Sequence, residues 1–210
     1  ALYAYVGCYS TPDRDGNGEG INVYRMDPAS GRWSHVQLVA GLENPSFLAL
    51  DRRQRFLYSV HGDRTYAMAF VIDPESGRLT RLNQQEVGGE NPVHLALDAT
   101  DRFLVASNYS SGSLAVLPIN ADGSLAPRSD LVELEGTPGP HPTRQTGSNP
   151  HHNPFDPAGR FLMVPDLGLD RLFVFRLDTA TGALVPADPP FVATRAGAGP
   201  RHVDFHPSRP

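Results

Sequence analysis

The sequence predicts an all-β protein, a β-propeller of four-stranded blades. One observation is a unit that recurs four times, in which an Asn-Pro or Gly-Pro pair precedes a marker residue: Asp51, Asp98, Asp156 or His206. A second observation is a turn of the Asp-Pro-x-x-Gly type, which starts at positions 27, 73, 120 and 178. The two series keep the same period, close to 50 residues. Two independent markers in phase, with short strands between them, are typical of a propeller.

The strands follow in order from these markers. The first 43 residues supply three strands, at 3–9, 21–26 and 33–40, with a polar loop at 13–20. In each later unit an inner strand begins after the proline, where the missing N–H costs no ladder bond. The second strand carries Arg-Phe-Leu, the third ends at the Asp-Pro-x-x-Gly turn, and the fourth returns to the next proline.

A single domain over residues 1–210 follows from this reading. We expect a partial blade at 1–43, blades at 44–90, 91–148 and 149–198, and the start of a further inner strand at 199–210. The blade at 91–148 contains an insertion at 136–148. About four blades of a larger ring are therefore expected, and closure into a four-bladed ring is the alternative.

Composition limits the function. The chain is 40% hydrophobic and 20% charged, as in ordinary globular proteins. Its net charge of −5 argues against a nucleic-acid partner but leaves room for a small anionic ligand, because local charge decides steering. No apolar run approaches the roughly 18 residues of a membrane helix, and the first residues do not have the pattern of a signal peptide. Cys8 is the single cysteine, which favours a reducing, cytoplasmic location. Nothing in the sequence indicates an oligomeric state.

The strand order brings the starts of the inner strands to one rim of the disc. The residue directly after the proline is Ser46, Val93, His151 or Arg201 in successive units. In the last two units this position holds a histidine and an arginine in place of the serine and valine of the earlier units. This difference indicates that the position has a specialised role in the last two units. His151 either makes a hydrogen bond within the channel or converges with Arg201 on an anionic ligand.

Other side chains are expected near this rim. His94, His152 and His202 recur at the next position, and recurrence favours a structural role. The rim loops contain Asn108 and Asp166, and the insertion brings Arg144. We take the candidate substrate contacts to be Arg144, Asn108, His94, His202 and Asp166.

Three patterns resemble other sites. The segment Asp13-x-Asp15-x-Asn17-Gly18 matches the opening of a calcium loop, but Tyr24 stands at its twelfth position and strands flank it, so we expect a flexible loop. The neighbours His151 and His152 would diverge on a strand, which argues against zinc. The glycines at 16, 18 and 20 do not have the spacing of a dinucleotide-binding loop.

Several motifs together are similar to one known family. They are Tyr5-Val6-Gly7-x-Tyr9, Asn91-Pro92-Val93-His94-Leu95-Ala96-Leu97-Asp98, Pro150-His151, Pro165-Asp166-Leu167-Gly168-x-Asp170-Arg171 and Gly199-Pro200-Arg201-His202-x-x-Phe205-His206-Pro207. On these residues the sequence resembles the lactonase family of seven-bladed β-propellers, which contains bacterial 6-phosphogluconolactonases and fungal carboxy-muconate lactonising enzymes. The resemblance covers essentially the whole chain.

The resemblance implies a lactone hydrolase acting on a small anionic lactone such as 6-phosphoglucono-δ-lactone, in the pentose phosphate pathway. It implies His151 as general base and Arg201 as anion clamp, with a later Glu and a further Arg; the last Glu of this sequence is Glu135. This chemistry needs no metal or organic cofactor. The alternatives are a carboxy-muconate cycloisomerase and a non-catalytic propeller that binds a partner or a sugar.

Overall fold

The computed structural model describes residues 2–208. Over this range the chain forms fourteen β-strands and a single short 3₁₀ helix, η1 (Pro12–Arg14). None of the described residues belongs to a helix with the length and apolar character needed to cross a membrane. The protein is therefore all-β, as the repeats predict.

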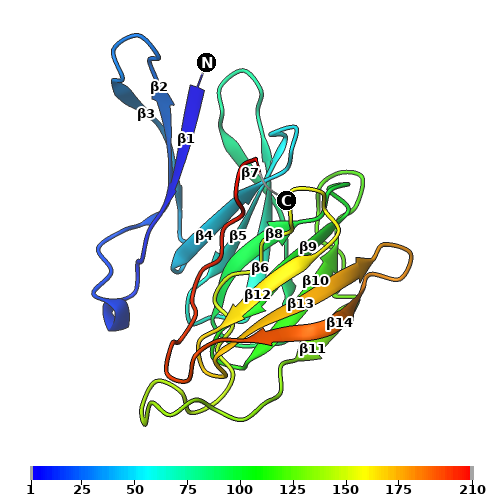
Figure 1. Cartoon of the computed structure of the whole chain (residues 1–210). Helices are drawn as coiled ribbons and strands as arrows, with labels where there is room; N and C mark the ends of the chain where they lie inside the picture. The colour runs from blue at the N-terminus through cyan, green and yellow to red at the C-terminus, as the bar shows by residue number, and fades with distance from the viewer. Residues whose placement is uncertain (1, 209–210) are drawn as a thin grey trace.

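The strands form four antiparallel sheets in chain order (Figure 1). The first sheet consists of β1 (Leu2–Gly7), β2 (Gly20–Met26) and β3 (Trp33–Ala40). The second consists of β4 (Pro45–Leu50), β5 (Phe56–His61), β6 (Tyr66–Ile72) and β7 (Leu79–Glu86). The third consists of β8 (Pro92–Leu97), β9 (Phe103–Asn108), β10 (Ser113–Pro118) and β11 (Asp130–Glu133). The fourth consists of β12 (Leu162–Asp166), β13 (Arg171–Asp178) and β14 (Ala183–Ala193).

The repeated aspartate caps a turn. Asp51 Oδ1 accepts hydrogen bonds from the backbone N–H groups of Arg55 (2.6 Å) and Phe56 (2.8 Å), and Asp98 and Asp156 do the same with the residues four and five positions later. The arginine of each turn also lies over the ring of the following phenylalanine, at 5.0–5.6 Å from its centroid. The Asp…Arg-Phe pattern thus forms the turn that joins the inner strand to the second strand, which explains its recurrence.

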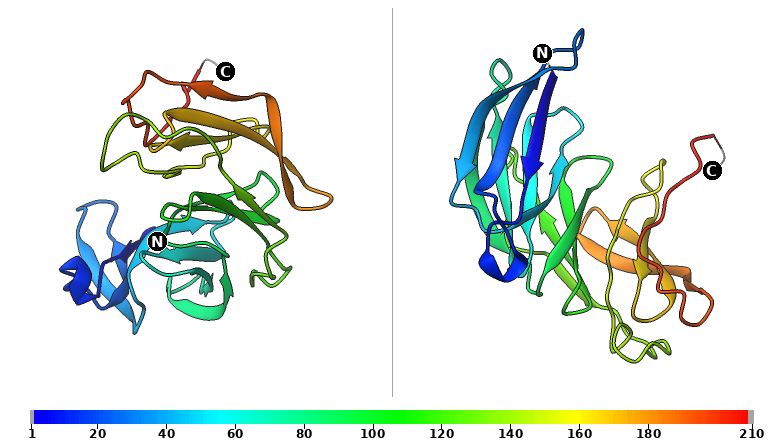
Figure 2. Two further views of the ribbon diagram at one scale, coloured as in Figure 1. Left: turned by 90° about the horizontal axis from the view of Figure 1, so that it is seen from below. Right: turned by 90° about the vertical axis from the view of Figure 1, so that its left-hand side faces the viewer.

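Three apolar clusters lie between successive sheets. Ile21 and Val23 pack with Leu57 and Phe70 between the first and second sheets, and all four are fully buried. Equivalent clusters fill the spaces between the second and third and between the third and fourth sheets. Because each sheet buries its faces against its neighbours, the four sheets fan out one after another around an open arc (Figure 2). The molecule is a β-propeller with about four of seven blades.

The fourth unit departs from the expected four strands. The predicted inner strand after Pro150 is reduced to two isolated bridges, Pro150 to Asp166 and Phe155 to Leu162. The cause is a proline in each of the two paired segments. Pro154 follows Pro150 in the first segment, Pro165 lies in β12, and neither has an N–H to donate. The further inner strand expected from residue 199 is likewise absent from the part of the chain that the structure describes.

Candidate functional site

A polar cavity of about 310 Å³ opens on the rim where the inner strands begin. Its lining residues come from segments nearly 200 positions apart in sequence: Tyr9, Arg14, Asn91, Val93, Tyr109, Arg144, His151, Leu167 and Arg201. Three of the residues singled out from the sequence, His151, Arg201 and Arg144, therefore meet at one cavity. We refer to it as the rim pocket.

His151 is a half-buried imidazole held between two rings. Its ring centroid lies 5.7 Å from that of Tyr109 and 5.2 Å from that of His202, both in edge-on geometry. Its backbone N–H is fixed on Pro165 O at 3.3 Å. Nδ1 is buried without a hydrogen-bond partner among residues 2–208, so the ring is positioned by packing while this nitrogen stays uncommitted.

Burial, followed by the nearby positive charge of Arg201, lowers the pKa of His151 to about 4. Both causes act in the same direction, because a cationic imidazole loses hydration and meets another cation. His151 is therefore neutral at pH 7 and carries a lone pair that can accept a proton.

Three guanidinium groups face the rim pocket. Arg144 and Arg201 are exposed side chains that form no ion pair within the described range. Arg14, in contrast, makes a two-point ion pair with Asp63, in which Nε and Nη2 each lie 2.5 Å from a carboxylate oxygen. The cavity therefore holds two unpaired guanidinium charges and a third that Asp63 neutralises, although the chain as a whole carries a net charge of −5.

Two predicted substrate contacts, Asn108 and Asp166, are fully buried and do not line the rim pocket. Asp166 accepts hydrogen bonds from Ser148 Oγ (2.5 Å) and from the backbone N–H groups of Asn149, Gly168 and Leu169. Asn108 donates to Ser113 Oγ at 3.1 Å. Both side chains shape the loops that carry pocket residues, and the prediction that they touch substrate has no support in this geometry.

The recurring histidines form a row of rings across the inner segments. Phe47 and His94 have centroids 4.3 Å apart, His94 and His152 4.2 Å, and His152 and His202 5.3 Å. His94 is buried and also contacts Asn153 Oδ1 at 2.6 Å. Burial lowers its pKa to about 3, which keeps it neutral. This row of packed rings favours a structural role for the recurring histidines. Neither His94 nor His202 lines the rim pocket.

The loop after β1 is tied to the start of the second sheet at residues 10 and 11, just before the segment 13–20. The tether is Asn44, which is fully buried. Asn44 Oδ1 accepts from the backbone N–H groups of Ser10 (2.8 Å) and Thr11 (3.1 Å), and Nδ2 donates to Gly62 O at 3.3 Å. The loop delivers Tyr9 and Arg14 to the rim pocket. Sequence reasoning missed both, because their pairing partners lie tens of residues away.

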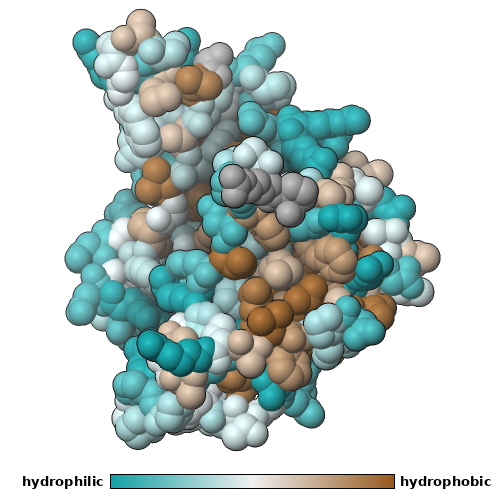
Figure 3. All heavy atoms as spheres, in the orientation of Figure 1, coloured by the Kyte–Doolittle hydropathy of each residue, from teal (hydrophilic) through white to brown (hydrophobic). Residues whose placement is uncertain are grey.

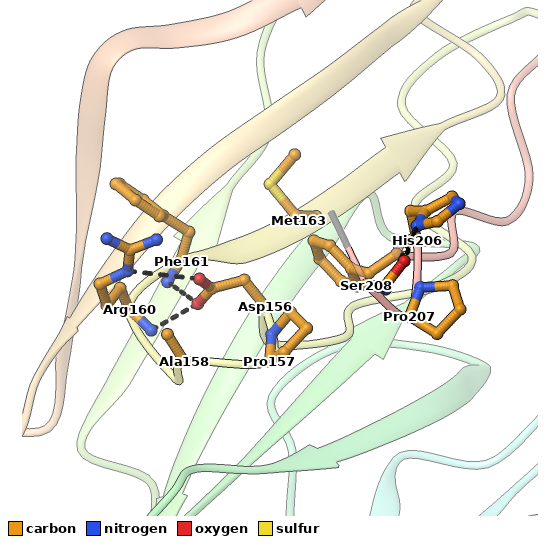
Figure 4. A pocket seen from close by; sticks show the side chains of 10 residues that line it. Asp156, Pro157, Ala158, Arg160, Phe161, Met163, His206, Pro207 and Ser208 are labelled. Atoms are coloured by element: carbon orange, nitrogen blue, oxygen red, sulfur yellow. Dashed lines mark hydrogen bonds and ion pairs between the residues drawn. The ribbon is translucent and has the colours of Figure 1, made fainter. Parts of the chain in front are cut away.

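A larger cavity of about 490 Å³ lies elsewhere, between the turn at 156–161 and the C-terminal residues 205–208 (Figure 4). Its carboxylate, Asp156, is already engaged by the backbone N–H groups of Arg160 and Phe161, and the remaining walls are mainly apolar, including Met163 and Phe205. Hydrophobic side chains also gather on the surface over β12 and β13, beside the C-terminal segment (Figure 3). This cavity is suited to packing rather than to chemistry.

Comparison with known proteins agrees with the fold. A family model for the seven-bladed β-propeller lactonases matches residues 3–210. A 6-phosphogluconolactonase of Bacillus subtilis is 35% identical over 206 residues, which cover 97% of this chain and 56% of that protein.

Solved structures give the same result. A putative 6-phosphogluconolactonase of Bacteroides fragilis superposes with a TM-score of 0.87 at 33% identity, over 97% of this chain and 58% of that one. A periplasmic gluconolactonase of Pseudomonas aeruginosa superposes with a TM-score of 0.84 at 37% identity, over 98% of this chain and 59% of that one. The chain spans little more than half the length of these relatives. It belongs to the lactonase family of seven-bladed β-propellers.

Proposed function

We propose that this chain forms the His- and Arg-bearing part of a lactone hydrolase of the 6-phosphogluconolactonase type. The single observation that carries the proposal is the meeting of the His151 imidazole, neutral at pH 7, with the Arg201 guanidinium in the lining of one cavity. The names of the relatives support a lactone as substrate class. The anionic form of that lactone is supported by the unpaired guanidinium groups of Arg144 and Arg201 in the rim pocket.

In the proposed reaction His151 takes a proton from a water molecule while the water oxygen attacks the ring carbonyl carbon. The carbonyl π electrons move to oxygen, and Arg201 holds this oxyanion through charge-assisted hydrogen bonds. Collapse of the intermediate breaks the bond to the ring oxygen, which receives the proton back from His151. The product is the open-chain hydroxy acid, and the base is regenerated.

Arg201 has two opposing effects in this scheme. Its charge helps to hold the pKa of His151 at about 4, which keeps the base unprotonated but weak. An anionic substrate bound between the two groups offsets that charge and raises the pKa of the imidazole. The base therefore becomes stronger when substrate is present.

The test is hydrolysis of 6-phosphoglucono-δ-lactone by the protein at its full natural length, with spontaneous hydrolysis subtracted. His151→Ala and Arg201→Ala should each lower kcat/KM by at least ~100-fold, as expected for loss of a general base or an oxyanion contact. The exposed residues His35 and Arg32, which lie in the first sheet and its turn, supply matched alanine controls. Full activity in both site variants would refute the assignment, and a folded but inactive wild type would direct attention to muconate lactones and then to a binding role.

The cellular location is a separate part of the proposal. A cytoplasmic enzyme is expected from the lone Cys8, whereas the Pseudomonas aeruginosa relative is described as periplasmic. Fractionation of cells that express the full-length protein decides between the two compartments.

A further inference from the structure

The relatives raise a question of specificity that the rim pocket addresses. Some are named for a phosphorylated lactone, and one is named for gluconolactone. A phosphorylated sugar lactone differs from its parent by a dianionic group at the end of the molecule remote from the reacting carbonyl. An enzyme that distinguishes the two needs a cation placed away from the catalytic base.

Arg14 enters the rim pocket from the first sheet, whereas His151 belongs to the fourth unit. It reaches the rim pocket from the loop after β1, and its recorded contacts are to Asp63 and to the Tyr9 ring, 5.5 Å from its centroid. Arg201, in contrast, belongs to the reacting end, because it shares the pocket with His151 and its charge is, after burial, the next cause that lowers the pKa of His151. The two guanidinium groups therefore serve different parts of one cavity.

Asp63 fixes the orientation of Arg14. The carboxylate occupies Nε–H and one N–H of Nη2, which leaves three of the five guanidinium N–H groups for another acceptor. Asp63 is itself held, since its backbone N–H donates to Oδ1 of Asn91, another pocket residue, at 3.1 Å. The arginine is thus a preorganised donor, and ordering it on binding costs little side-chain entropy.

The loop that carries Arg14 is equally fixed. Besides the Asn44 tether, Gly16 N–H donates to Thr11 O and Gly18 N–H donates to Tyr9 O, both at 3.0 Å. A rigid loop, a pinned guanidinium and three free donors together make a built anion site, distinct from the pair His151 and Arg201.

We propose that Arg14 is a specificity-determining residue that binds the phosphoryl group of the lactone, and that Asp63 is its positioning residue. This inference rests on the proposed lactonase function and deepens it. A phosphoryl group presents several acceptor oxygens, which match the forked donors of a guanidinium better than those of a single ammonium. Arg14 therefore contributes to binding of the phosphorylated lactone and leaves the unphosphorylated lactone unaffected.

The kinetic experiment compares 6-phosphoglucono-δ-lactone with glucono-δ-lactone, using the protein at its full natural length. Arg14→Ala should lower kcat/KM for the phosphorylated lactone by roughly 10- to 100-fold, mostly through KM, while the value for the unphosphorylated lactone stays within about twofold. Arg14→Lys should recover part of the loss. Asp63→Asn should change KM for the phosphorylated lactone alone, and only while Arg14 is present, with no effect in the Arg14→Ala background. Arg32→Ala is the matched control. An equal loss on both lactones, or no loss on either, would overturn the proposal.

A binding experiment separates this proposal from the catalytic one. By calorimetry, the wild type should bind 6-phosphogluconate more tightly than gluconate, and Arg14→Ala should remove most of that preference. If the wild type hydrolyses neither lactone but shows a preference that Arg14→Ala removes, the lactonase proposal fails and phosphoryl binding by Arg14 stands. If the wild type shows no preference, the role of Arg14 is refuted whether or not lactone is hydrolysed.

Discussion

Acid should destabilise this protein through His61, a buried histidine outside the rim pocket. His61 ends β5 and is fully buried. Its Nδ1 lies 2.6 Å from Glu43 O and its Nε2 lies 2.9 Å from Ser59 Oγ. These contacts suit the neutral ring with its proton on Nδ1, because a carbonyl can only accept and the hydroxyl can donate. Burial is the main cause that lowers the pKa of His61 to about 4.

The size of the effect follows from linkage. Between pH 6.5 and pH 4 the unfolded chain binds a proton at His61 that the folded chain does not, so stability falls as the pH falls through this window. At pH 5 the unfolded imidazole, with a pKa of about 6.5, is almost fully protonated, while the folded one is about nine-tenths neutral. The resulting loss relative to pH 7 is about 2 kcal/mol from this one side chain.

The measurement is urea unfolding at pH 7, 6 and 5 at constant ionic strength, for wild type and His61→Asn. The variant keeps a donor near Glu43 O but cannot titrate, so its stability should fall by about 2 kcal/mol less than that of wild type over this range. His35→Asn, at an exposed position, should follow the wild type. Parallel curves for wild type and His61→Asn would refute the reasoning that burial keeps this imidazole neutral.

Three further variants test other parts of the structure. Arg201→Met should raise the pKa of His151 above 4 while burial keeps it below 6.5, so the acid limb of the pH profile of kcat/KM moves to higher pH; an unmoved limb would mean that His151 is not the titrating base. Asp166→Ala removes the acceptor of four hydrogen bonds and should lower the free energy of unfolding in urea by about 2–3 kcal/mol, whereas a loss below ~0.5 kcal/mol would contradict the buried network. Asn44→Ala should cost about 1–3 kcal/mol and speed proteolysis within residues 10–18, and an unchanged cleavage rate would show that the tether is dispensable.

The sequence predicted most of the fold because the repeat is local. Strand order and turn positions depend on short motifs, such as Asp51 with Arg55 and Phe56, which recur with little change. The inner strand of the fourth unit was predicted wrongly, because the pairing depends on both partners. Pro154 could be tolerated at an edge, but Pro165 on the facing strand removes a second donor.

The rim pocket was only partly predictable. His151 and Arg201 stand at equivalent positions of consecutive repeats, so their convergence follows from the period. Arg14 gave no such signal, because its environment is created by Asp63, which lies 49 residues later in the sequence. The buried acceptor role of Asp166 was also hidden, since a loop aspartate looks the same whether it faces solvent or caps its own backbone.

The spread of the rim pocket along the chain has a consequence for folding. Each sheet is closed by contacts between neighbouring strands and can form early, since short hairpin loops have low closure entropy. The pocket joins Tyr9 to Arg201 and exists only when all four sheets have docked. A ligand in the pocket therefore binds the assembled state alone, and its binding free energy adds directly to the cohesion between blades. A ligand bound in the rim pocket would stabilise the packing of the sheets on one another and leave the stability of each separate sheet unchanged.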